Sequence, residues 1–258
     1  MNHHSIAEMI LNNAMELHGQ PKWTFGKNTC NTYAVYAEKI RVGDHETIPS
    51  WPILELIAGD KALTHLYSRW FLEASMAYAM ELTERTNAHI TISVKLLPAF
   101  AESAEFVETV LGLLEKTGLP AKRLHFELSE AQALTEQGIQ NLNALHDEHG
   151  IGLWIGNFGT GHSNLDLLTK VHFDGIELDR SFAAMIPENE QACEVVAGIQ
   201  RLAYTMGLEL CAKGIETQEQ FEFFEGLEIV KGQGYLIGKP MPKDEVIEYI
   251  ENYAIKFK

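Results

Sequence analysis

Charged and polar residues stand at or just beyond the ends of short apolar runs in this 258-residue chain. They are Arg41, Lys95, Glu127, Asn157 (preceded by Gly156), Glu177, Asp179, Lys213, Glu216 and Gln233. Carboxylate and amide oxygens are ligands for hard cations, whereas guanidinium groups bind phosphate well. Although these residues lie far apart in the sequence, the carboxyl ends of barrel strands meet at one face, so we expect them to converge there.

The apolar runs that carry these residues alternate with amphipathic segments. They are too short for helices and too continuous for half-exposed strands, which indicates buried parallel strands. We predict strands at 22–28, 33–41, 90–95, 122–128, 151–156, 174–179, 208–213 and 229–236. We predict helices near 61–86 and at 103–117, 136–149, 163–170, 189–206, 217–226 and 243–256. Gly118, Gly150 and Gly207 each follow a predicted helix, where glycine takes the left-handed conformation that ends it.

Alternating strands and helices predict an α/β fold. Eight strands in a chain of about 250 residues favour a closed, TIM-like (β/α)8 barrel over an open sheet. The first two strands follow each other without a helix, so we expect a hairpin and hence an antiparallel first strand. A separate helix is expected over residues 3–19, which divides the chain into an N-terminal accessory segment, 1–20, and a barrel domain, 21–258.

The composition excludes several classes of protein. The chain carries 36 acidic and 20 basic residues, a formal net charge of −16, which disfavours broad binding to nucleic acid or to an anionic membrane. Its start has no basic region followed by an apolar stretch, so we expect no signal peptide. Three cysteines are too few and too scattered for a disulfide framework or a zinc site. These features predict a soluble cytoplasmic protein.

Five motifs, found in matching order and spacing, resemble those of the EAL family, bacterial phosphodiesterases that linearise cyclic di-GMP. The segments are HFELSE (family LEITE), NFGTGHSNL (DDFGTGYSSL), IELDRSF (LKIDRSF), AKGIETQEQ (AEGVETEEQ) and GQGYLIGKPMP (VQGYLFSKPMP). The resemblance covers roughly residues 21–250 and is weaker before residue 120. It implies a barrel whose first strand is antiparallel to the others, in agreement with the predicted hairpin.

The resemblance also implies a reaction that uses two Mg²⁺ or Mn²⁺ ions to assist an in-line displacement on phosphorus. Matching the motifs residue by residue indicates that most of the ligands are lost. Ala37 stands where the family has its name-giving glutamate, Lys95 replaces an asparagine and Lys213 replaces a glutamate. Gly156 and Asn157 replace a pair of aspartates.

The remaining family positions are kept or exchanged. Glu127 and Gln233 are retained, Glu177 replaces a lysine, and Asp179 and Glu216 also match family positions. Lysine has no lone pair to offer a cation when charged and repels it. We therefore expect that the metal pair is lost, that no cofactor is used and that no residue acts catalytically by the family mechanism.

The lysines must find partners if they are buried, because an unpaired buried charge is costly. According to the resemblance, the family has a lysine on its sixth strand and a glutamate on its seventh strand. This chain has Glu177 at the first of these positions and Lys213 at the second. We therefore hypothesise that Lys213 pairs with Glu177 and Lys95 with Glu127, so that ammonium groups supply the positive charge of the metals.

Three functions stay open on this basis. The first is a degenerate, non-catalytic EAL domain that regulates signalling through protein partners, with a homodimer favoured by the resemblance. The second is a non-catalytic cyclic di-GMP receptor that uses Arg41, Asp179, Glu216 and Gln233. The third is an active phosphodiesterase with an altered metal site built from Glu38, Glu127, Glu177 and Glu216.

Two other motifs carry weaker hypotheses. The QGYLIGKPMP segment either holds a nucleotide base or only leads the chain into the last helix. His146 and His149 lie one turn apart on a predicted helix, a spacing that permits metal binding but more often marks a solvated face.

Overall fold

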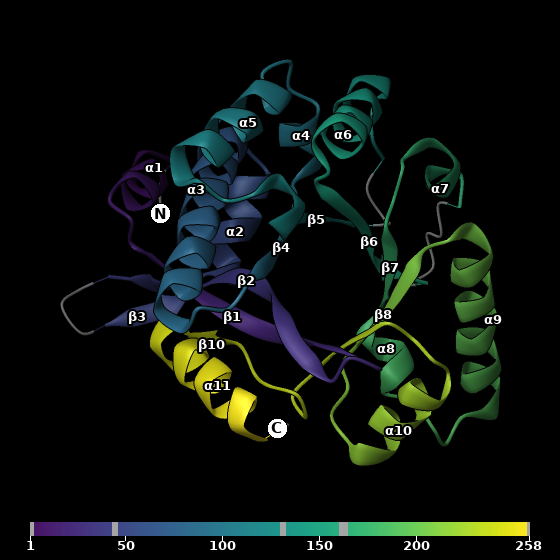
Figure 1. The fold of residues 1–258 in the computed structure, drawn as a ribbon. Coiled ribbons are helices and arrows are strands. Elements are labelled where there is room, and N and C mark those ends of the chain that lie inside the picture. The colour runs from purple at the N-terminus through teal and green to yellow at the C-terminus, as the bar shows by residue number, and fades with distance from the viewer. Residues whose placement is uncertain (1–2, 43–45, 130–132, 160–164, 257–258) are drawn as a thin grey trace.

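The computed structural model describes residues 3–42, 46–129, 133–159 and 165–256. Within these residues the strands form one sheet that closes into a barrel (Figure 1). The barrel strands are β1 (Met15–Thr24), β2 (Thr29–Arg41), β4 (Thr91–Lys95), β5 (Leu124–Ser129), β6 (Gly152–Phe158), β7 (Gly175–Leu178), β8 (Glu209–Lys213) and β9 (Lys231–Gln233). The strand order β1-β9-β8-β7-β6-β5-β4-β2 is closed by the pairing of β1 with β2.

Seven barrel strands run parallel to one another: β2, β4, β5, β6, β7, β8 and β9. Strand β1 lies between β2 and β9 and is antiparallel to both. The predicted (β/α)8 barrel with an antiparallel first strand is therefore confirmed. Two short strands, β3 (Thr47–Pro49) and β10 (Met241–Pro242), extend the sheet beside β2 and β1.

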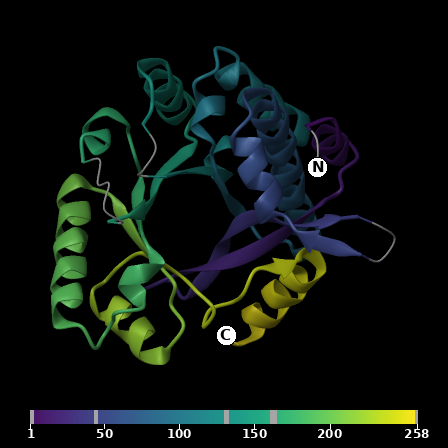
Figure 2. The same ribbon diagram turned by 180° about the vertical axis from the view of Figure 1, so that it is seen from behind.

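Helices surround the barrel and leave its two ends open to view (Figures 1 and 2). They are α1 (His3–Leu11), α2 (Trp51–Ala58), α3 (Lys61–Thr86), α4 (Pro98–Ala101), α5 (Phe106–Thr117), α6 (Glu136–His149), α7 (Leu167–Lys170), α8 (Arg180–Ala183), α9 (Glu190–Met206), α10 (Gln218–Gly226), α11 (Lys243–Lys256) and the 3-10 turn η1 (Ala121–Arg123). Their apolar faces pack on the barrel wall, where residues such as Phe106, Phe126 and Ile176 are completely buried.

The helix ends follow the glycine pattern. Helices α5, α6 and α9 end at Gly118, Gly150 and Gly207, each of which has a left-handed backbone with φ of 75°, 72° and 72°. Each glycine N–H also bonds a carbonyl of the preceding turn, so all three predicted caps are confirmed.

The N-terminal prediction is wrong in its extent. The helix predicted over residues 3–19 ends at Leu11, and the residues from Met15 onward form β1. The proposed boundary between residues 20 and 21 therefore falls inside a barrel strand. Strand β9 is also shorter than the predicted 229–236, because the chain turns after Gln233. The helix α2 and the strand β3 were not predicted.

In the described part of the chain, none of the helices has the length and apolar character needed to span a bilayer. Cys30, Cys193 and Cys211 do not form disulfides with one another.

Candidate functional site

A cleft of about 540 Å³ opens at the carboxyl ends of the parallel strands. Its lining residues are Gln20, Tyr36, Glu38, Asn157, Asp179, Arg180, Lys213, Gly214, Glu216, Gln233, Gly234, Tyr235 and Pro240. Asn157, Asp179, Lys213, Glu216 and Gln233 thus converge at one mouth, as the barrel topology predicts. A smaller hollow of about 240 Å³ adjoins it and is lined by Lys95, Glu127 and Gly156, among others.

Beneath the cleft, four charged side chains form a closed cluster in the barrel interior. Lys22 Nζ lies 2.7 Å from Oε1 of Glu127 and 2.5 Å from Oε1 of Glu177. Lys213 Nζ lies 3.0 Å from Oε2 of Glu127 and also contacts Oε2 of Glu177. Each carboxylate oxygen of the cluster therefore has an ammonium group as its partner, and the four charges sum to zero.

The cluster is deeply buried. The side chains of Glu177 and Lys22 are 0% and 3% exposed, those of Glu127 and Lys213 are 10% and 18% exposed. Burial alone would neutralise these groups, but the ion pairs outweigh it. The pKa of Glu127 is held well below its ordinary value by Lys213 and Lys22, and the pKa of Lys213 is held well above its ordinary value by Glu127 and Glu177. The same two carboxylates raise the pKa of Lys22. Glu127, Lys213 and Lys22 are therefore charged at neutral pH.

Neighbouring polar groups add hydrogen bonds to this layer. Ser93 donates from its hydroxyl to Oε1 of Glu127 at 2.5 Å and accepts from Lys22 Nζ at 3.0 Å. Above it, the buried amide of Gln233 donates to Oε1 of Gln20 at 2.7 Å and to the Tyr36 hydroxyl at 3.0 Å. The floor of the cleft is thus built before any ligand enters.

These residues do not fit a pair of divalent cations. Both oxygens of Glu127 and both oxygens of Glu177 are engaged by lysines, and two ammonium groups lie within 3 Å of them. Ala37 offers no ligand atom, and its carbonyl accepts a hydrogen bond from Ser50. A cation placed here would meet positive charge from Lys22 and Lys213, so the donor set that Mg²⁺ or Mn²⁺ requires is not assembled.

The two ion pairs predicted from the sequence have different outcomes. The pairing of Lys213 with Glu177 is confirmed. The pairing of Lys95 with Glu127 is wrong: Lys95 lies exposed at the end of β4 and makes no ion pair with the described residues. Lys22 takes its place, because it approaches Glu127 from β1 through the barrel interior, whereas Lys95 at the rim can stay in water.

Three of the four predicted ligand-binding residues lie in the cleft, and the fourth does not. Asp179, Glu216 and Gln233 line the cleft, and Asp179 also caps α8 by accepting the Ser181 N–H at 2.9 Å. Arg41 is not among the lining residues; it is 58% exposed and lies 3.3 Å from Glu16 at the outer end of β2. Arginine at the mouth is supplied instead by Arg180.

The sequence prediction missed Gln20, Lys22, Tyr36 and Arg180. Gln20 and Lys22 are two residues apart in β1. This is the spacing of side chains that face the same side of a strand. That signal was readable, but the assumed helix over residues 3–19 obscured it. Arg180 directly follows Asp179 within the IELDRSF motif, and its position after a strand end was an available signal.

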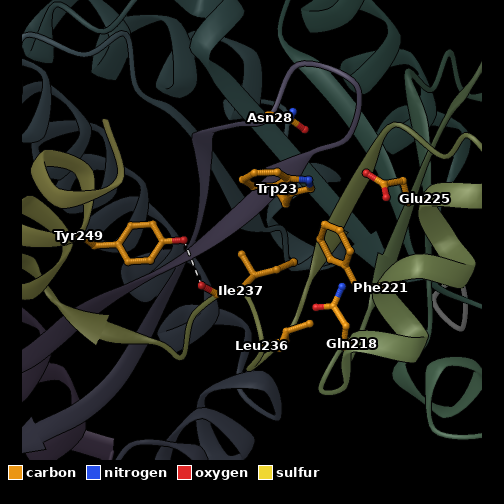
Figure 3. Close-up of a pocket in the computed structure, with 8 residues that line it drawn as sticks. All are labelled: Trp23, Asn28, Gln218, Phe221, Glu225, Leu236, Ile237 and Tyr249. Carbon is orange, nitrogen blue, oxygen red and sulfur yellow. Dashed lines mark hydrogen bonds between the residues drawn. The ribbon is translucent and has the colours of Figure 1, made fainter. Parts of the chain in front are cut away.

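A second hollow, of about 440 Å³, lies away from the mouth (Figure 3). Trp23 and Phe221 lie next to each other in its lining, with ring centroids 6.0 Å apart. Tyr249 donates from its hydroxyl to the Ile237 carbonyl at 3.0 Å, which ties α11 to the segment after β9. Its lining side chains include no cation, so it offers little to an anionic ligand.

Part of two motifs lies outside the described residues: 160–164 in NFGTGHSNL, and Glu130, the last residue of HFELSE. Within the described part, Gly156 is buried in β6 and Asn157 follows it with a left-handed backbone at φ 56°.

The family model described as EAL domain matches residues 3–240 of the chain. Among curated proteins, the chain is 31% identical over 196 residues to the cyclic di-GMP phosphodiesterase PdeF of Escherichia coli, which covers 76% of this chain and 26% of PdeF. It is 30% identical over 162 residues to the cyclic di-GMP phosphodiesterase RocR of Pseudomonas aeruginosa, covering 62% of this chain and 41% of RocR.

Among solved structures, the EAL enzyme Bd1971 in its cAMP- and cyclic-di-GMP-bound form superposes with a TM-score of 0.87 at 23% identity, covering 96% of this chain and 67% of that one. The chain spans less than half of the length of the two curated relatives, RocR and PdeF.

Proposed function

Because the chain belongs to the EAL domain family, we propose that it is a degenerate, non-catalytic member that regulates bacterial signalling through protein partners. The observation that carries this proposal is the neutral cluster of Lys22, Glu127, Glu177 and Lys213. It fills the centre of the mouth with internal ion pairs where the family resemblance implies two metal ions. A fold can keep its scaffold while its site acquires another use.

The chemistry of the cluster argues against hydrolysis by a metal-activated water. A divalent ion lowers the pKa of its bound water and neutralises the developing charge on phosphorus. The ammonium group of Lys213 can donate hydrogen bonds to a phosphate oxygen, but its raised pKa prevents it from accepting a proton from water. Lys213 therefore cannot generate hydroxide at neutral pH.

The direct test is a restoration experiment. The wild-type protein is incubated with cyclic di-GMP and Mn²⁺, and release of the linear dinucleotide is measured against a blank without protein. We expect no release above the blank. A variant with the substitutions Ala37→Glu, Lys95→Asn, Gly156→Asp, Asn157→Asp, Glu177→Lys and Lys213→Glu should gain metal-dependent activity. Chelator-sensitive hydrolysis by the wild type would overturn the proposal.

A non-catalytic cyclic di-GMP receptor is the second candidate, and the open cleft favours it. Arg180 and Lys213 line the cleft with Tyr235, a ring that is 57% exposed and could stack on a base. Against this, Glu38, Asp179 and Glu216 line the same cleft and repel a dianion. Calorimetry with cyclic di-GMP, with and without Mg²⁺, separates the candidates: heat that is independent of Mg²⁺ indicates a receptor, and no heat indicates a scaffold.

An active enzyme with an altered metal site is the third candidate. It would need Glu127 and Glu177 to release their lysines and join Glu38 and Glu216, which lie at the cleft wall. Breaking four buried ion pairs makes this arrangement costly. The hydrolysis assay above tests it directly.

The same proposal places the domain in the cytoplasm, where cysteine side chains stay reduced. It also includes assembly as a homodimer, which the family resemblance favours. Sedimentation or light scattering of the purified protein measures that state, and a pull-down from the source organism identifies the protein partner.

A further inference from the structure

A second group of chemically active side chains lies at the opposite end of the barrel. His146 and Asp147 stand in the last turn of α6, and His172 and Asp174 lie in the segment that leads into β7. Since α6 precedes the start of β6, all four lie near the amino ends of β6 and β7. The mouth residues Asn157 and Asp179 lie at the carboxyl ends of the same strands, so this group is distinct from the cleft.

The ligand atoms of His146, Asp147 and His172 lie within 4.8 Å of one another. Nδ1 of His146 is 2.8 Å from Oδ1 of Asp147, and Nδ1 of His172 is 3.0 Å from both oxygens of the same carboxylate. Two nitrogen or oxygen ligands of one tetrahedral Zn²⁺ are about 3.4 Å apart, given bonds of about 2.0–2.1 Å. The three groups therefore need only small movements to share one ion.

The surrounding contacts orient these ligands. The other ring nitrogen of His146, Nε2, lies 3.3 Å from Oδ1 of Asp174. Asp174 is itself fixed, because its Oδ2 accepts the N–H of Leu153 at 2.8 Å and its own N–H donates to the Leu153 carbonyl at 2.8 Å. A carboxylate on the distal nitrogen of a histidine is the usual outer partner of a metal-bound imidazole.

His172 is also held in place by its backbone. Its N–H donates to the Asn143 side-chain oxygen at 3.0 Å, and the amide of Asn143 donates to the Lys170 carbonyl at 2.9 Å. Asn143 belongs to α6, so it ties the segment after α7 to the helix that carries His146 and Asp147. Two segments separated by more than twenty residues are thus joined around the same point.

From this geometry we propose a divalent transition-metal site of the zinc type, with His146, Asp147 and His172 as ligands and Asp174 as their outer partner. Two imidazoles and one carboxylate suit Zn²⁺ rather than Mg²⁺ or Ca²⁺, which prefer oxygen ligands. Three protein ligands leave a fourth position for water or for a group from another chain. The ion would clamp α6 to the start of β7 and stabilise the barrel from the end opposite the cleft. His149, the partner suggested by sequence spacing, is exposed and takes no part.

The test is titration of tag-free, chelator-treated full-length protein with ZnCl2 by calorimetry, together with thermal unfolding. We expect one Zn²⁺ per chain with micromolar affinity, and a rise of several degrees in Tm. His172→Gln should abolish this binding. Asp174→Asn keeps an acceptor for Leu153 and should weaken the affinity by about 10- to 100-fold. His149→Gln, on the same helix, is the matched control and should bind like the wild type.

A second set of measurements tests whether zinc binds at histidines or cysteines outside the cluster. His4 and Cys193 are outside the cluster, and His4→Gln and Cys193→Ser should leave the binding unchanged. Titration with Co²⁺ should give the visible absorption of a nitrogen- and oxygen-ligated tetrahedral ion, without a thiolate band. Absence of binding at 0.1 mM Zn²⁺, or binding that persists undiminished in a folded His172→Gln variant, overturns the proposal.

Discussion

Lys213 of β8 forms an ion pair with Glu177 of β7 inside the barrel, with Glu177 completely buried and Lys213 18% exposed. The two residues stand on neighbouring strands, and the charge that each carries is the opposite of the one that the family resemblance implies for its position. An exchange of this kind keeps one cation and one anion on these two strands while it changes which strand presents the cation. Together with Lys22 and Glu127 this pair forms a neutral, self-contained cluster.

The first prediction concerns the partner that sequence reasoning missed. Lys22→Met should lower the free energy of unfolding by about 3–5 kcal/mol, because it leaves buried carboxylate charge with one ammonium group instead of two. Urea denaturation monitored by tryptophan fluorescence measures this. Lys95→Met is the control, because Lys95 is exposed and forms no ion pair with the described residues; its effect should stay within about 0.5 kcal/mol. Equal effects of the two substitutions would contradict the assigned role of Lys22.

The second prediction concerns metal ions at the mouth. Mg²⁺ or Mn²⁺ should leave the Tm of a variant lacking the zinc-type site, His172→Gln, unchanged. Adding Lys213→Glu replaces an ammonium by a carboxylate and gives the cluster a net charge of −2, which should destabilise the fold and create an attractive site for a divalent cation.

Mn²⁺ should therefore raise the Tm of the Lys213→Glu background by several degrees and leave the parent background unaffected. The comparison is made by thermal unfolding at fixed ionic strength, with Ca²⁺ as a second ion. A Tm rise of similar size in both backgrounds would show that the lysines do not exclude the metal.

The sequence predicted best those elements whose structure depends on residues that are close together in the chain. Helices α3, α6 and α11 have the predicted bounds, since the hydrogen bonds of a helix join residues within its own turns. The start of β1 was misread because Ile6, Ile10 and Leu17 also fit helical spacing. Pairing with β2 and β10, which lie elsewhere in the chain, makes residues 15–19 a strand.

The residues of the site could also be predicted only in part. Motif positions were sufficient to bring Asp179, Lys213 and Gln233 to one mouth, because strand ends of a barrel must converge. The identity of each ion pair was not readable to the same degree. Lys95 is the register partner of Glu127 on the neighbouring strand, yet its side chain is exposed, whereas Lys22 reaches Glu127 from β1 through the barrel interior.

The third prediction is a dependence of stability on pH through His125. Burial, with Lys231 and Lys22 nearby, lowers the pKa of this ring to about 3, whereas the unfolded chain has an ordinary value near 6.5. The unfolded state therefore binds more protons between these values, and stability falls as the pH drops through this window. The loss should be on the order of 2–3 kcal/mol, less than the full shift supplies, because the ring keeps some contact with water.

This contribution is isolated by substitution. His125→Phe retains a ring next to Trp154, whose centroid lies 6.1 Å away. It should make the decline of unfolding free energy between pH 6.5 and pH 4.5 shallower than in the wild type. His149→Phe changes an exposed histidine and should leave the decline unaltered. Parallel pH profiles of the wild type and His125→Phe would refute the role of His125.

The last prediction uses two glycines close together in the chain that differ only in backbone conformation. Gly118 ends α5 with φ of 75°, whereas Gly112 lies within that helix, and a methyl group at either position would meet no atom within 4 Å. Gly118→Ala should therefore destabilise the protein by about 1–2 kcal/mol, because alanine is strained in the left-handed region. Gly112→Ala should stabilise it by about 0.5–1 kcal/mol, because alanine loses less backbone entropy in a helix. Chemical denaturation at pH 7 measures both, and effects of the same sign would mean that contacts, not backbone conformation, decide the role of these glycines.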